Sequence, residues 1–210
     1  MTLKSIKHNP FKIVQMFEEE LCEYTNSPYC ITVDSCTNAL FLCLLYHNIK
    51  NKEIIIPKKT YLSVPQSIIH AGGIPVFKSY DWNGFYYLDP YPIIDSAKRL
   101  TSNMYIKNTF MCLSFHIKKH LPIGKGGAIL FDDFEAINFF KEMRYEGRSE
   151  KAYHEDDIML NGYNFYMTPE EAARGLTLLL NYPKDVPDLG ENGGYRDLTD
   201  FTIFKNYKQI

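Results

Sequence analysis

Apolar residues recur along the chain in two alternating patterns. Spacing typical of amphipathic or buried helices predicts helices over 11–25, 36–49, 61–73, 134–147 and 168–180. Short β-rich runs between them predict strands over 29–35, 53–57, 74–80, 91–97, 109–115 and 126–133. Thr168, Pro169 and Glu171 form a start signal for the last helix. The alternation of short strands with helices predicts an α/β fold with a mostly parallel sheet.

The chain changes character from Pro183 onward. The segment 182–198 is rich in Pro, Gly and Asp, so we expect loops there. A last short strand is predicted over 201–204, where the sequence reads FTIF.

Composition narrows the possible partners and compartment. The 210 residues are 45% hydrophobic, enough for one substantial core, and the net charge of −2 comes from well-mixed charges. This balance gives no footprint for nucleic acid or for a membrane surface, so neither is an expected partner. The five cysteines form no CxxC pair, the first residues lack the apolar core of a signal peptide, and no run is long enough to span a bilayer. We therefore expect a cytoplasmic protein.

Three positions that could carry chemistry follow predicted strands, where α/β folds bind ligands. They are the turn 35–38, Asp95, and the segment SFHIKKHLPIGKGG with Lys118 and Lys119. Each has an ordinary structural explanation: a helix cap at Ser35 or Thr37, a turn carboxylate, and two solvated lysines. The turn could equally cradle an anion with its backbone N–H groups.

Taken in order, the motifs resemble the DegT family of sugar aminotransferases, pyridoxal-phosphate (PLP) enzymes of the aspartate aminotransferase fold type. DSCTNAL is similar to the family's strand and SGTxAL turn, and IIDSAK to its DxAQ motif. SFHIKKHLPIGKGG resembles SFxxxKxLxxGxGG, and GYNFYM resembles GYNxRM. The resemblance runs from about residue 17 to residue 180 and implies a three-layer α/β/α large domain of PLP-transferase fold type I.

The resemblance also implies a role for individual residues. Lys119 becomes the catalytic Schiff-base lysine, Asp95 the partner of the pyridine nitrogen, and Tyr61 the aromatic residue that stacks on the ring. The other implied cofactor contacts are Ser35, Cys36, Thr37, Lys98, Ser114 and, at a neighbouring subunit, Asn164. Such chemistry needs a nucleophilic amine that can also move a proton, and a carboxylate that keeps the ring nitrogen protonated. No metal is implied.

Several positions depart from the family pattern. Cys36 replaces a glycine, Lys98 a glutamine, Lys125 a glutamate that is common there, and Tyr166 an arginine. Lys98 could pair with the cofactor phenolate or disturb the site, and the sequence leaves both open. The connection between Phe77 and Ile93 is also shorter than the family's.

These patterns predict two parts of the chain: a compact, truncated PLP-binding large domain over 1–182, and a short tail over 183–210 in place of the small domain. The implied function is transfer of an amino group, with glutamate as the expected donor, to a nucleotide-linked keto sugar, in a homodimer with shared active sites. One alternative is a noncatalytic PLP-binding or interaction protein derived from such an enzyme. A PLP-dependent sugar dehydratase is a third, against which Lys119 argues, because eliminating relatives carry histidine there.

Overall fold

A computed structural model describes residues 9, 11–149, 151–190 and 194–210. The helices are α1 (Lys12–Thr25), α2 (Cys36–Tyr46), α3 (Ser63–His70), α4 (Ala136–Met143) and α5 (Pro169–Leu179). The strands are β1 (Tyr29–Val33), β2 (Glu53–Pro57), β3 (Ile74–Lys78), β4 (Tyr86–Tyr87), β5 (Ile93–Asp95), β6 (Phe110–Ser114) and β7 (Gly127–Phe131). Every predicted helix and strand up to residue 180 is therefore present, and β4 is an additional strand.

The strands form a central sheet and a smaller pair beside it. The central order is β1-β7-β6-β5-β4, and β2 pairs with β3 in parallel. Because β7 is antiparallel to both β1 and β6, those two strands share one direction, which β5 also follows. An antiparallel bridge from Ile55 to Asp89, just after β4, gives β2 and β3 that same direction. The expected α/β fold is confirmed. The central sheet is mixed and not mostly parallel: among its described strands only β5 and β6 pair in parallel, because β4 and β7 run the other way.

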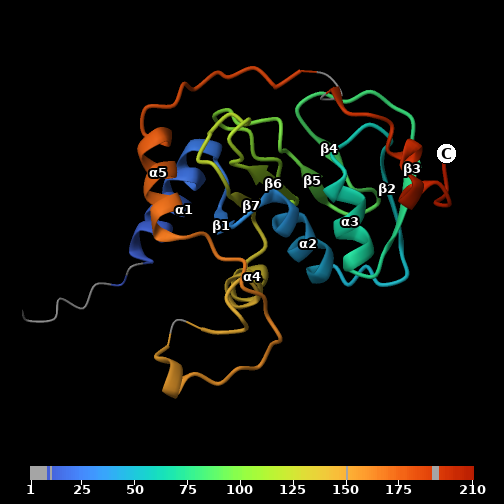
Figure 1. The fold of residues 1–210 in the computed structure, drawn as a ribbon. Helices are drawn as coiled ribbons and strands as arrows, with labels where there is room; N and C mark the ends of the chain where they lie inside the picture. The colour runs from blue at the N-terminus through green and yellow to red at the C-terminus, as the bar shows by residue number, and fades with distance from the viewer. Residues whose placement is uncertain (1–8, 10, 150, 191–193) are drawn as a thin grey trace, which may run out of the picture.

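Helices cover both faces of the central sheet, as Figure 1 shows. Alternate residues of β6 enter opposite cores: Met111 and Leu113 pack with α1 and α5, whereas Phe110 and Cys112 pack with α2 and α4. This period-two alternation buries both faces of the strand, which explains why its sequence is continuously apolar. The molecule thus has the three layers of an α/β/α fold.

The helix boundaries follow local signals. At α5 the Thr168 hydroxyl accepts from the Glu171 N–H and the Glu171 carboxylate accepts from the Thr168 N–H, so the expected capping box is confirmed. Helix α4 ends at Met143, before the predicted Gly147. Glu146 and Gly147 both have positive φ, and a Cβ on Gly147 would lie 1.9 Å from the Leu160 carbonyl oxygen, so the chain turns back there on a glycine.

The predicted strand over 201–204 is wrong. Residues Thr202–Phe204 form a 3-10 turn, which places the buried Phe204 ring 5.7 Å from the ring of Phe77. The strand-like pairing comes later, where Ile210 N–H donates to the Phe77 carbonyl. An isolated FTIF run does not reveal that its last aromatic residue must turn inward to reach β3.

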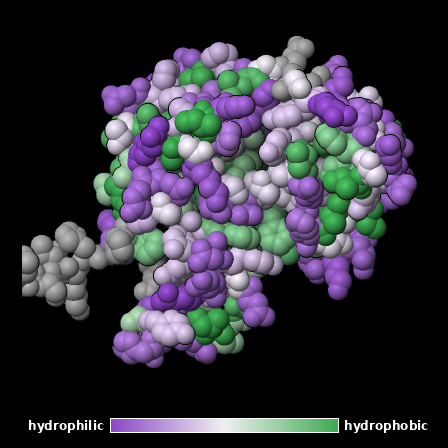
Figure 2. Space-filling model, in the orientation of Figure 1, coloured by the Kyte–Doolittle hydropathy of each residue, from purple (hydrophilic) through white to green (hydrophobic). Residues whose placement is uncertain are grey.

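The described parts of the tail run from α5 across one edge of the domain to β3 (Figure 1). No helix within the described ranges is both long and apolar enough to cross a bilayer. The face shown in Figure 2 is largely hydrophilic, with its hydrophobic residues in small groups.

Candidate active site

The order of the central strands gathers the candidate residues at one edge of the sheet. Gly127, the first residue of β7, pairs with Val33 on one side and with Ser114 on the other. The turn that follows β1 and the end of β6 therefore flank the start of β7. A Cβ on Gly127 would lie 2.5 Å from the Cys36 nitrogen, so the turn packs directly against this strand and requires glycine there.

The turn after β1 opens helix α2 with free backbone donors. The Ser35 hydroxyl accepts from the Asn38 N–H at 3.2 Å, which confirms Ser35 as the N-cap. The Thr37 hydroxyl lies 2.8 Å from the Ser63 hydroxyl. Beside the turn, Lys125 Nζ contacts the Asp34 carboxylate at 3.1 Å, so this departure from the family supplies a cation that balances Asp34. A helix N-terminus with hydroxyl side chains suits a phosphate group.

Asp95 ends β5 as a buried carboxylate, with 6% of its surface exposed. Its oxygens accept from the Tyr86 hydroxyl at 2.6 Å and from the Ala97 N–H at 2.9 Å. Burial raises the pKa of Asp95, while these two hydrogen bonds and the positive charge of Lys119 act in the opposite direction. A protonated pyridine nitrogen of PLP would place a positive charge directly beside this buried carboxylate.

Lys119 lies in the loop between β6 and β7, where its N–H donates to the His116 carbonyl at 2.8 Å. Its side chain is half-buried and its Nζ donates to the Tyr195 hydroxyl at 3.5 Å, whereas the neighbouring Lys118 is exposed. The charge of Lys119 influences the pKa of Asp95, Cys36 and Lys98. The structure thus brings the loop lysine close to the residues that end β5 and begin α2.

Lys98 and Tyr61 border the same site. Lys98 is buried, donates to the Gly190 carbonyl at 3.3 Å, and has its Nζ 5.8 Å from the ring centres of Trp82 and Tyr195. Tyr61, by contrast, is 53% exposed, and its ring centre lies 6.0 Å from that of Tyr195.

Lys98 should leave a signature in the pH dependence of stability. Burial lowers the pKa of its ammonium and the charge of Lys119 lowers it further, so the folded protein holds this proton less firmly than the unfolded chain does. The stability cost is present at low pH and disappears as the pH approaches the unfolded value of about 10.4. We expect wild type to gain unfolding free energy relative to Lys98→Gln as the pH rises toward about 10.4, measured by urea titration. Lys118→Gln is the control, and equal pH profiles for wild type and Lys98→Gln would contradict the expectation.

Asn164 is not brought to Lys119 by any contact within the described part of the chain. Its side-chain amide donates to the Glu146 carboxylate at 2.9 Å, and its backbone bridges to Tyr145. The carbonyl of the next residue, Phe165, accepts from the Asp34 N–H at 2.7 Å, so the segment runs beside the turn after β1. Its role at a neighbouring subunit stays a prediction.

Two tyrosines of the site were missed by the sequence analysis. Tyr86 lies in the short connection before β5, where no pattern indicated that its hydroxyl would bond to Asp95. Tyr195 lies in the tail, in a Gly-rich stretch that predicts only loops. Burial raises the pKa of Tyr195 to about 12, and the negative charge of Asp95 raises it too.

A lysine on a loop, a buried carboxylate at a strand end and an open helix N-terminus together define the large domain of fold type I, the class of PLP-dependent aminotransferases. The family model "DegT/DnrJ/EryC1/StrS aminotransferase family" matches residues 2–94 and 105–184. The chain belongs to this family of sugar aminotransferases.

Individual relatives agree with this assignment. A "UDP-4-amino-4,6-dideoxy-N-acetyl-beta-L-altrosamine transaminase" of Campylobacter jejuni is 23% identical over 80% of this chain and 56% of its own length. The solved PLP-form of a putative sugar aminotransferase, Spr1654 from Streptococcus pneumoniae, has a TM-score of 0.66 and 21% identity, over 81% of this chain and 59% of its own. A DegT DnrJ EryC1 StrS aminotransferase from Brucella abortus has a TM-score of 0.75 and 17% identity, over 94% of this chain and 80% of its own. The chain spans about half the length of the curated relatives that it matches.

Proposed function

We propose that this chain is a PLP-dependent aminotransferase that moves an amino group, with glutamate as donor, to a keto sugar carried on a nucleotide. The observation that carries the proposal is that the half-buried Lys119 and the buried Asp95 both lie near Tyr195 and Cys36, close enough for the Lys119 charge to lower the pKa of the Asp95 carboxyl. Membership of a sugar aminotransferase family supports the reaction, and a relative named for a UDP-linked amino sugar supports the substrate class.

The residues present fit the cofactor at each of its chemical groups. Asp95 would offer a carboxylate to the ring nitrogen, and Tyr61 an exposed aromatic ring for stacking. The turn 35–37 and Ser114 would offer backbone and hydroxyl donors to the phosphate. When bound, PLP supplies an aldehyde and an electron-withdrawing ring. The Cys36 side chain takes the place of a glycine, and burial raises the pKa of its thiol, so the thiol is neutral and adds no negative charge where the phosphate would bind.

Lys119 would have two tasks on this scaffold. Its amine provides the nucleophile for the aldehyde, and when released it can carry a proton to and from the substrate carbon. Asp95 would hold the proton at the ring nitrogen throughout. Lys98 takes the place of the family's glutamine beside the ring hydroxyl and would offer that hydroxyl a cation.

The proposal is tested by adding PLP to the purified protein and recording the visible absorption band that the cofactor shows when covalently bound to a lysine. We expect a band that is lost when glutamate is added and restored by a keto acid. A band that does not respond to any amino donor, together with no amino transfer to a nucleotide-linked keto sugar, would contradict the aminotransferase proposal.

A noncatalytic PLP-binding protein is the second candidate, favoured by one observation. The chain spans only 55–56% of the length of the curated relatives, so the match covers the cofactor motifs but not the rest of those relatives. A stable visible band without turnover is the result that this candidate predicts.

We expect the protein to be at least a dimer. If Asn164 reaches a neighbour's cofactor phosphate, a single subunit holds an incomplete site. Sedimentation should give a dimer mass, and Asn164→Ala should weaken PLP binding without lowering that mass. Full PLP occupancy in a monomer would contradict the shared site.

A further inference from the structure

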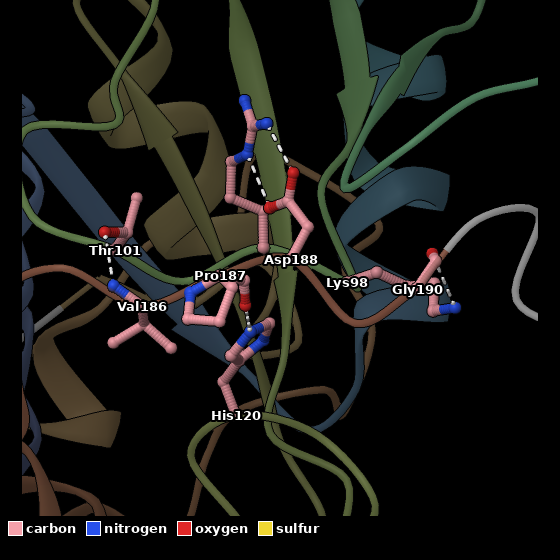
Figure 3. Close-up of polar contacts among 8 residues, drawn as sticks. Lys98, Thr101, His120, Val186, Pro187, Asp188 and Gly190 are labelled. Atoms are coloured by element: carbon pink, nitrogen blue, oxygen red, sulfur yellow. Dashed lines mark hydrogen bonds and ion pairs between the residues drawn. The ribbon is translucent and has the colours of Figure 1, made fainter.

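The tail is fixed to the domain immediately beside the proposed cofactor site. The Asp188 carboxylate accepts two hydrogen bonds from the Arg99 guanidinium, at 2.6 and 2.8 Å. His120, next to Lys119, contacts the Pro187 carbonyl at 2.9 Å, and the Val186 N–H donates to the Thr101 hydroxyl at 3.1 Å; both contacts are drawn in Figure 3. The first half of the tail is thus attached both to the loop after β5 and to the lysine loop.

A second attachment holds the other half. The Leu198 N–H donates to the Lys58 carbonyl, and the buried Leu198 and Phe204 enter the core beside α3 and β3. Tyr195 lies between these two attachments, in the described residues just before Leu198.

The Tyr195 side chain is directed into the group of residues proposed to bind PLP. Its hydroxyl lies 3.5 Å from Lys119 Nζ, and its ring centre lies 6.0 Å from that of Tyr61. On its other side the ring is nearly parallel to the Trp82 ring, at 6.5 Å and 17°, and Lys98 Nζ is 5.8 Å away. Tyr195 therefore lies next to three residues with proposed roles in PLP binding: Lys119 for the aldehyde, Tyr61 for the face of the ring, and Lys98 for the ring hydroxyl.

The Tyr195 side chain occupies space that a cofactor held by Lys119 and Tyr61 would need. Its hydroxyl is within hydrogen-bond distance of the Lys119 amine, at 3.5 Å, on the atom that would attack the aldehyde. Its ring lies 6.0 Å from that of Tyr61, tilted by 53°, which is within the range of aromatic contacts, so Tyr195 already packs against the ring expected to stack on the cofactor.

We propose that Tyr195 is an intramolecular ligand of the cofactor site, which PLP must displace to reach Lys119. The phenol mimics the hydroxyl-bearing pyridine ring in size and polarity, and it covers the Lys119 amine while the cofactor is absent. The two attachments of the tail keep Tyr195 near the site at high effective concentration. This inference rests on the proposed function, because it takes PLP as the competing ligand.

The test is PLP binding to the cofactor-free protein, followed by the visible band, for wild type, Tyr195→Ala and Tyr195→Phe. If Tyr195 fills the site about 90% of the time, removing its ring should tighten the apparent affinity about tenfold and speed binding. Tyr195→Phe keeps the ring but loses the hydroxyl that contacts Lys119, so its apparent affinity should fall between those of wild type and Tyr195→Ala. Tyr207→Ala, in the same tail but packed on Phe204, is the matched control and should leave PLP binding unchanged.

The possible outcomes distinguish failure of this proposal from failure of the proposed PLP-dependent function on which it rests. Weaker PLP binding by Tyr195→Ala would make Tyr195 a wall of the site and overturn the proposal, as would equal binding by all four proteins. Thermal unfolding of each variant shows whether weaker binding reflects a misfolded protein, in which case Tyr195→Ser is compared instead. If neither wild type nor Tyr195→Ala gives a visible band or a borohydride-trapped PLP adduct, the proposed function itself fails, and this inference with it.

Discussion

Lys119→Ala is expected to abolish both the visible band of PLP and all amino transfer. The other lysines near the site are unsuited to replace its amine: Lys118 is exposed, and Lys98 is directed to the Gly190 carbonyl. Without the lysine no covalent bond to the cofactor forms, and no group remains to carry the proton to the substrate carbon. The spectrum and an amino-transfer assay measure the two losses separately.

Lys118→Ala is the matched control for this prediction. Its side chain is exposed one position away, so we expect both the band and the transfer activity to remain nearly unchanged. Borohydride reduction of the PLP complex followed by peptide mapping identifies the modified lysine directly. Label on Lys118 or Lys98 would show that the assignment of Lys119 is wrong.

Features of the fold that depend on a short stretch of sequence alone could be predicted. Strand β6 reads as an apolar run because both of its faces are buried, and the Ser35 cap follows from a polar residue placed just before an apolar helix. The family motifs then assigned a chemical role to each strand end. These assignments stay predictions, and the geometry supports them most directly for Asp95 and Lys119.

Features that depend on distant parts of the chain were not predictable in this way. The hydrogen bond from the Tyr86 hydroxyl to Asp95 joins β4 to β5. The short connection between these strands carries no periodic pattern that would predict it. Tyr195 meets Lys119 across 76 positions, and its position is set by the attachments of the tail on both sides of it. The turn at Thr202–Phe204 likewise depends on Phe77, which no local pattern links to it.

Glu18→Ala is expected to lower the free energy of unfolding by roughly 3–5 kcal/mol, because it leaves a buried arginine without its counter-charge. The Glu18 carboxylate accepts from the N–H and the hydroxyl of Thr32, both at 2.8 Å, and from the Arg144 guanidinium. Arg144 also donates to the Thr32 carbonyl at 2.7 Å. Urea unfolding measures the change, and Glu53→Ala is the control, since its ion pair with Lys208 is exposed and worth about 0–1 kcal/mol.

The same network connects two parts of the proposed site, so this loss should extend to function. Thr32 lies in β1 just before the turn at Ser35, while the Arg144 carbonyl accepts from the Phe165 N–H at 2.9 Å, next to Asn164. Replacing the pair together, as Glu18→Leu with Arg144→Met, should recover most of the stability because no unpaired charge stays buried. If Glu18→Ala alone costs less than about 1 kcal/mol, water reaches Arg144 and the network does not hold β1 against the segment that carries Asn164.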